Sequence, residues 1–159
     1  MTQPNESYPK EMVTIEKTTE DSEEKQVVTV INNEYEEEAV EVAIAYMNAF
    51  NEGDVEKLST CINFPHARVG ANGNLVVSEK ADALMSPDFF EEFRKRYEWN
   101  HSCWDSREVI QSIENKVHLQ VTFSRYRVDG SNIGTFPSIW VITKQDNHWG
   151  IKMRSSFAF

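Results

Sequence analysis

The chain has 159 residues, of which 40% are hydrophobic, and this is the size and composition of one globular domain. Its formal net charge is −10, and residues 1–38 contain 11 acidic but only 3 basic side chains. The acidity is therefore concentrated near the N-terminus. A negative surface repels phosphate backbones, so nucleic acid is not an expected partner.

Membrane and secretory segments are not expected either. No apolar run approaches the ~20 residues that a membrane helix needs. The first ten residues are polar, contain Pro4 and Pro9, and lack the basic start and apolar centre of a signal peptide. We therefore expect a cytoplasmic protein with no membrane partner.

The N-terminal residues have a composition typical of a tail. Residues 1–25 are rich in Glu, Thr, Ser and Lys, which favours a flexible acidic tail followed by a single domain over residues 26–159. Two short alternations of apolar and polar residues, at 12–15 and 27–31, permit a hairpin across residues 20–25 instead. Both interpretations remain open from the sequence.

The first predicted helix spans residues 34–52. Asn33 can cap it, with Glu36 three residues later, and Gly53 can end it. Asp54 then caps a short second helix that runs to about residue 61, so the pair forms a helical hairpin. One apolar stripe at helical spacing marks the buried face: Val40, Ala43, Ile44, Met47 and Phe50.

Two short strands and a third helix follow. The strands are predicted at 66–69 and 75–78, with an Asn-Gly turn in 71–74 that tolerates positive φ. Ser86 followed by Pro87 favours a helix start, and apolar residues recur at helical spacing from there to about residue 99.

The rest of the chain indicates β-structure. Strands are predicted at 104–113, 116–128, 136–144 and 149–159. Because helices and strands are segregated along the chain, the fold class is α+β. We expect three helices packed in a strongly bent antiparallel sheet.

This order of elements, and the stretch Ala-Tyr-Met-Asn-Ala-Phe-Asn-Glu-Gly-Asp at residues 45–54, resemble nuclear transport factor 2-like (NTF2-like) proteins. That superfamily includes ketosteroid isomerases, SnoaL-type polyketide cyclases and non-catalytic association domains. Residues 104–109 and 149–157 resemble an uncharacterised SnoaL-like branch. The resemblance covers residues 34–159 and implies a cone-shaped fold with an internal pocket, and commonly a homodimer formed through the sheet.

The resemblance gives Tyr46 a candidate catalytic role. In ketosteroid isomerases a tyrosine at the matching helical position donates to a developing oxyanion; a core tyrosine is the simpler interpretation. The isomerase general base falls at Gly70, which has no side chain, and its second donor has no counterpart in residues 139–142. Isomerisation of that type is therefore not expected.

His66 and Arg68 are the other catalytic candidates. They lie two residues apart on a predicted strand, so they share a face. If that face is inward, His66 can act as a general acid or base, and Arg68 can fix a carboxylate, enolate or carbonyl oxygen. The alternative register places Ala67 and Val69 inward and both polar groups outside.

Aromatic residues and one arginine are expected to line the pocket. Arg125 continues the phase of the apolar face of its strand and can close the mouth, whereas Arg154 shares a face with Lys152 and is expected on the outer surface. No metal-ligand spacing or cofactor motif occurs, so neither metal nor cofactor is expected. The predicted lining residues are Phe64, Phe93, Trp99, Trp104, Phe123, Arg125 and Trp140.

Two functional hypotheses follow. The first is a small-molecule-binding domain with an apolar pocket, with a cofactor-independent lyase, isomerase, cyclase or hydrolase activity as its catalytic form. The alternative is a non-catalytic homodimeric association or scaffold module. A fold of this kind does not by itself decide between them.

Overall fold

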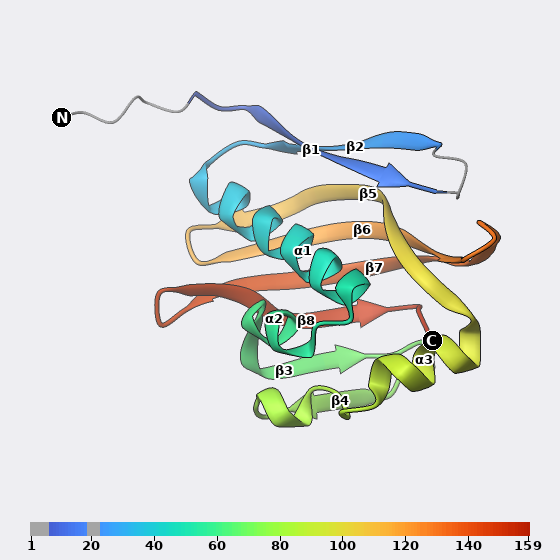
Figure 1. The fold of residues 1–159 in the computed structure, drawn as a ribbon. Helices are drawn as coiled ribbons and strands as arrows, with labels where there is room; N and C mark the ends of the chain where they lie inside the picture. Colours follow the sequence, from blue (N-terminus) through green and yellow to red (C-terminus); the bar gives the residue numbers. More distant parts are fainter. Residues whose placement is uncertain (1–6, 19–22) are drawn as a thin grey trace.

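The computed structural model describes residues 7–18 and 23–159, which form a curved six-stranded sheet, three α-helices and a two-stranded hairpin (Figure 1). The order of strands in the large sheet is β4-β3-β8-β7-β6-β5. Its neighbours are antiparallel except β3 and β8, which run parallel. The strands are β3 (Ile62–Val69), β4 (Leu75–Ser78), β5 (Trp99–Ile113), β6 (Lys116–Arg127), β7 (Asn132–Gln145) and β8 (His148–Ser156).

Helix α1 (Glu34–Glu52) crosses one face of this sheet and has the predicted bounds. The Oδ1 atom of Asn33 accepts from the backbone N–H of Glu36 at 2.9 Å, which caps the helix. Gly53 ends it in the left-handed conformation, with φ of 68°. The buried carboxylate of Glu36 accepts from Ser112 at 2.6 Å and so ties the helix start to β5.

The other two helices are short. Helix α2 (Val55–Thr60) is capped by Asp54, as predicted. Helix α3 (Phe89–Tyr97) begins three residues after Ser86, and a 3₁₀ turn at Ala81–Ala83 precedes it. Its aromatic face packs on Phe50 of α1, so α3 closes one end of the space between α1 and the sheet.

The core lies between α1 and the sheet. The predicted apolar face of β6 is confirmed, because Val117, Leu119 and Val121 are fully buried. Strand β5 begins five residues earlier than predicted. Three irregularities in its pairing with β6 interrupt the alternation that marks a strand in the sequence.

The hairpin corrects the expectation of a flexible tail over residues 1–25. Strand β1 (Lys10–Lys17) pairs antiparallel with β2 (Glu24–Ile31), so position 25 lies inside a strand. Buried Arg107 of β5 donates to Thr29 Oγ1 at 3.0 Å and to Thr14 Oγ1 at 2.9 Å, which fastens both strands to the sheet. Residues 1–6 and 19–22 lie outside the described residues.

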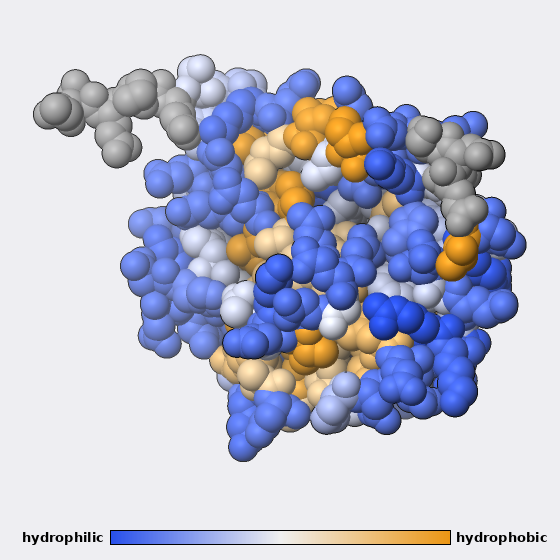
Figure 2. All heavy atoms as spheres, in the orientation of Figure 1, coloured by the Kyte–Doolittle hydropathy of each residue, from blue (hydrophilic) through white to orange (hydrophobic). Residues whose placement is uncertain are grey.

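The surface is mainly hydrophilic over the outward face of α1, and apolar side chains gather over the hairpin and near α2 and α3 (Figure 2). Among the described residues, no helix is long and apolar enough to cross a membrane.

Candidate functional site

The space enclosed by α1, α3 and the sheet contains a cavity with two compartments. The outer one has a volume of about 410 Å³ and the inner one about 40 Å³. Five residues line both compartments: Tyr46, Phe50, Arg68, Arg125 and Arg154. The three arginines therefore stand at the boundary between the two compartments.

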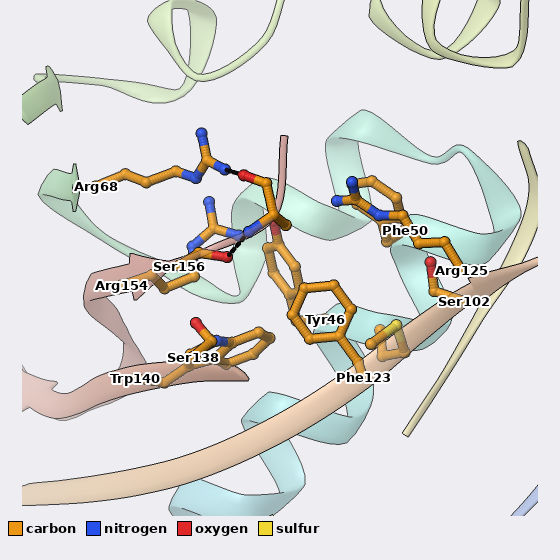
Figure 3. A pocket seen from close by; sticks show the side chains of 12 residues that line it. Tyr46, Phe50, Arg68, Ser102, Phe123, Arg125, Ser138, Trp140, Arg154 and Ser156 are labelled. Atoms are coloured by element: carbon orange, nitrogen blue, oxygen red, sulfur yellow. Dashed lines mark hydrogen bonds between the residues drawn. The ribbon is translucent and has the colours of Figure 1, made fainter. Parts of the chain in front are cut away.

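The fold brings these residues together from four elements (Figure 3). Tyr46 and Phe50 are four residues apart on α1 and share one face of the helix. Arg68 comes from β3 and Arg154 from its parallel neighbour β8, whereas Arg125 approaches from β6 on the other side. Residues that are distant in sequence thus converge because β3 lies beside β8.

The walls of the two compartments differ in character. Aromatic and aliphatic side chains dominate the outer wall, where Phe89, Phe93 and Tyr97 of α3 face Phe159. Three buried serines, Ser102, Ser138 and Ser156, line the inner compartment beside apolar residues. The inner end is therefore small and polar, and the outer part is large and mainly apolar.

Tyr46 is buried beneath Arg154. The Nη1 atom of Arg154 donates to the Tyr46 hydroxyl at 2.6 Å, and its guanidinium lies 4.8 Å from the centre of the tyrosine ring. The edge of this ring also meets Trp140, with 5.2 Å between ring centres. These contacts fix the phenol at the boundary of the two compartments.

His66 points inward, as the first register requires, but it lines neither compartment. Its Nδ1 lies 3.1 Å from the carbonyl oxygen of Ile151, which can only accept, so Nδ1 carries the proton. Nε2 is then an acceptor for the Nε–H of Arg154 at 3.4 Å. Burial, with the nearby charge of Arg154, lowers the pKa of His66 to about 4, so the imidazole is neutral at pH 7.

Arg125 is the most enclosed of the three arginines, with only 7% of its surface exposed. Its Nη1 donates to the main-chain oxygen of Phe159 at 2.7 Å, but its buried Nε has no hydrogen-bond partner among the described residues. Burial lowers the pKa of Arg125 to about 10, so it remains charged at neutral pH. Five rings lie within 6.0 Å of its guanidinium: Phe50, Phe93, Phe123, Phe136 and Phe159.

Arg68 also donates to main chain, from Nη2 to the carbonyl oxygen of Ala158 at 3.0 Å. Burial and the neighbouring charge of Arg154 lower its pKa. Within residues 7–18 and 23–159, no Asp or Glu side chain forms an ion pair with Arg68, Arg125 or Arg154. The cavity therefore concentrates positive charge that the described side chains leave uncompensated.

The structure places the predicted lining residues in different locations. Phe93 lines the outer compartment, and Phe123 and Trp140 line the inner one. Phe64 and Trp99 line neither. Trp99 packs inside the aromatic cluster, 5.3 Å from Phe50 and 5.4 Å from Phe93.

Trp104 faces a different cavity. That cavity has a volume of about 370 Å³ and lies between β1, α1 and β5. Sequence alternation does not separate these faces of β5, because pairing irregularities occur on both sides of Trp104.

The expectation for Arg154 was wrong. The pairing of β7 with β8 shifts between Val141 and Ile142, whose partners are Met153 and Ile151, so Lys152 is an extra residue in β8. The shift leaves Met153 exposed and turns Arg154 into the cavity. A regular alternation in the sequence contains no signal of such a bulge.

Comparison with known proteins agrees with this fold. Three solved structures illustrate it. A protein of unknown function with a cystatin-like fold from Nostoc punctiforme shares 14% identity over 76% of this chain and 88% of that chain, with a TM-score of 0.62. An NTF2-like protein from Novosphingobium aromaticivorans shares 14% identity over 76% and 79%, with a TM-score of 0.61. A ketosteroid isomerase-like protein from Erwinia carotovora atroseptica shares 16% identity over 78% and 95%, with a TM-score of 0.57.

At these identities the solved structures show the fold alone. No curated protein matches the chain significantly. The protein-family model described as "NTF2-like protein (DUF6841)" matches residues 36–154, which is most of the chain and includes Tyr46, Arg68, Arg125 and Arg154. The chain therefore belongs to this family of the NTF2-like superfamily, and its fold is the α+β cone that the sequence resemblance implies.

Proposed function

We propose that this protein binds a small, largely apolar molecule in the cavity between α1, α3 and the sheet, and anchors an oxygen of that molecule on the arginines. One observation supports the proposal most strongly. Arg68, Arg125 and Arg154 converge in an aromatic-walled cavity, and none has an Asp or Glu side chain as an ion-pair partner among the described residues.

The energetics favour a ligand there. Burying a charge without a counter-charge is costly, and proteins usually pair such groups or use them at functional sites. The outer compartment, at about 410 Å³, also falls within the ~300–1,000 Å³ typical of small-molecule sites. A ligand with an apolar body and an electron-rich oxygen would match both the apolar wall of the cavity and the positive charge of the arginines.

The same geometry suits polarisation of a carbonyl more than removal of a proton. Arg154 donates to the Tyr46 hydroxyl, which leaves the phenolic proton for a ligand oxygen, and such a donor stabilises developing negative charge. His66 is a poor general base, because it is buried and its Nε2 lone pair faces Arg154. The only side-chain carboxylate that lines the cavity in the described residues is that of Glu92, which is exposed.

Binding of the neutral fluorophore 1-N-phenylnaphthylamine tests the cavity directly. We expect its fluorescence to rise on binding to the wild-type protein, and Leu84→Trp, which fills the outer compartment, to abolish the rise. Asn115→Trp adds the same side chain at an exposed turn and should bind as the wild type does. Equal binding by both variants would place the probe elsewhere and refute the proposal.

We also propose that two copies associate through the outer face of the sheet. Four apolar residues lie side by side across that face and define an outer apolar row: Val77, Ala67, Met153 and Val141. Val77 is 49% exposed and Met153 39%, so a second copy would cover apolar surface. Sedimentation equilibrium measures the mass in solution, and a monomer at all concentrations would contradict this proposal.

A further inference from the structure

The inner compartment presents hydrogen-bond donors without acceptors. The buried Nε–H of Arg125 has no partner in the part of the chain that the structure describes. The hydroxyls of Ser102 and Ser156 accept from Trp99 Nε1 at 3.0 Å and from the Ala158 N–H at 3.1 Å. Neither hydroxyl proton has an acceptor among the described residues.

Tyr46 adds a fourth donor of the same kind. Its hydroxyl oxygen accepts from Arg154, and its hydroxyl proton has no acceptor among the described residues. Ser138 differs from the other two serines. Its hydroxyl accepts from Trp140 Nε1 at 3.0 Å and donates to the Ser155 carbonyl at 2.8 Å, so it is satisfied within the protein. Four donors therefore face this compartment without an engaged acceptor among the described residues.

The described side chains that line this compartment are poor in hydrogen-bond acceptors. Among the described lining residues there is no carboxylate, amide or imidazole. The carbonyl of Ala158 already accepts from Arg68, and that of Ser102 accepts from Asn51 at 2.9 Å. An acceptor-rich ligand group would satisfy the four donors together.

The volume and charge of the inner compartment limit which acceptor group of a ligand can bind there. Its volume is about 40 Å³, against the ~10–15 Å³ that a cavity needs on the same measure to hold one water, so only a group of a few atoms fits. An ionised carboxylate is planar, accepts only, and offers about four lone-pair sites. A phosphate monoester would place four heavy atoms there in a tetrahedral arrangement, against the three of a planar carboxylate, so the carboxylate suits this small space better.

We propose that the inner compartment is a carboxylate subsite, so that the ligand of this protein is an apolar monocarboxylate that enters carboxylate first and leaves its hydrocarbon or aryl body in the outer compartment. This inference rests on the proposed function, because it assigns the chemical class of the molecule that the cavity binds. Arg125 and the hydroxyls of Tyr46, Ser102 and Ser156 hold the carboxylate, and Phe89 and Phe93 contact the body.

Isothermal titration calorimetry with matched probes tests this assignment at pH 7. The probes are 3-phenylpropanoate, its neutral isostere 3-phenylpropanamide, and acetate, which has the same carboxylate without the apolar body. We expect the wild-type protein to bind 3-phenylpropanoate at least about tenfold more tightly than the amide, because hydrogen bonds to a charged group are worth more. Acetate should bind more weakly than 3-phenylpropanoate by a similar factor.

Two variants test which residues cause the preference for the carboxylate over the amide. Arg125→Met keeps an apolar chain of similar length among the phenylalanine rings and should remove the preference for the carboxylate over the amide. Ser102→Ala deletes one donor and should weaken only the carboxylate, by a few-fold. The wild-type comparison does not depend on how either variant folds.

The outcomes separate this inference from the proposed function. If 1-N-phenylnaphthylamine binds but the carboxylate binds no better than the amide, the cavity stands and the carboxylate subsite is refuted. The same conclusion holds if the fluorophore binds and neither phenylpropanoid does. If the fluorophore also fails to bind, both proposals fall.

Discussion

At the scale of single residues, the site depends on a chain of contacts from His66 through Arg154 to Tyr46. The imidazole accepts from Arg154 Nε, and Arg154 Nη1 donates to the phenol. His66 is therefore better described as a positioning residue that orients Arg154 than as a group that touches a ligand. Its neutrality is part of that role, because a protonated Nε2 cannot accept from a guanidinium.

Acid should weaken the folded state through His66. Between pH 6.5 and pH 4 the unfolded imidazole takes up a proton that folded His66, with its pKa lowered to about 4, does not. The free energy of unfolding should therefore fall across this window as pH falls, by up to roughly 3 kcal/mol from this residue. Urea unfolding of wild type and His66→Gln at several pH values measures the difference, and parallel pH profiles would contradict the prediction.

Removal of the Tyr46 hydroxyl should affect both stability and binding. In Tyr46→Phe, Arg154 Nη1 loses its acceptor, which we expect to cost about 1 kcal/mol of unfolding free energy. Binding of 3-phenylpropanoate should weaken by several-fold, because one donor is lost. Tyr126→Phe is the matched control, since the Tyr126 hydroxyl has no hydrogen bond in the described part of the chain; equal effects of the two changes would argue against the role of Tyr46.

At the scale of elements, the helix ends are the best-predicted features. Asn33, Gly53 and Asp54 set local backbone geometry by short-range contacts, so the bounds of α1 follow from the sequence. Strand bounds follow less well. Bulges in β5 and β8 depend on the pairing of distant strands, and alternation within one strand does not report them.

The same reason explains which parts of the site were predicted. Tyr46 was a candidate through the resemblance to ketosteroid isomerases, and Arg125 through the phase of the apolar face of its strand. Arg68 was a candidate in only one of two registers that its strand left open. Arg154 was missed because the bulge at Lys152 reverses its face. The buried serines Ser102 and Ser156 were missed because an inward serine resembles an outward one in the sequence.

Arg107 should be one of the main contacts that hold the hairpin to the sheet. Its guanidinium is buried and donates to both β1 and β2. In Arg107→Met these strands lose three donors, and we expect the amides of β1 and β2 to exchange with solvent faster while those of β6 and β7 change little. Hydrogen exchange measured by mass spectrometry tests this; Arg127→Met, at a half-exposed arginine of β6, is the control, and unchanged hairpin protection in Arg107→Met would contradict it.

At the scale of the whole molecule, the two faces of the sheet have separate proposed roles. The inner face and α1 enclose the cavity, and the outer apolar row offers a surface for a second copy. The residues of the two faces do not overlap. Binding and association should therefore be separable by mutation.

Met153→Glu should dissociate the proposed dimer without loss of binding. A carboxylate in the middle of the outer apolar row would be desolvated on association and left without a partner. We expect sedimentation equilibrium to change from dimer to monomer, while 1-N-phenylnaphthylamine still binds. Glu56→Lys, at an exposed position of helix α2 away from the sheet, should leave the mass unchanged; a Met153→Glu dimer would refute the proposed interface.

A crystal structure of the protein grown with 3-phenylpropanoate is the most direct test of the proposed site. We predict density for the carboxylate in the inner compartment, within hydrogen-bond distance of Arg125 Nε and the Ser102 hydroxyl, and for the phenyl ring beside Phe93. A cavity that stays empty at saturating ligand, or a ligand bound with its carboxylate toward solvent, would contradict the assignment of this cavity as an anchored carboxylate site.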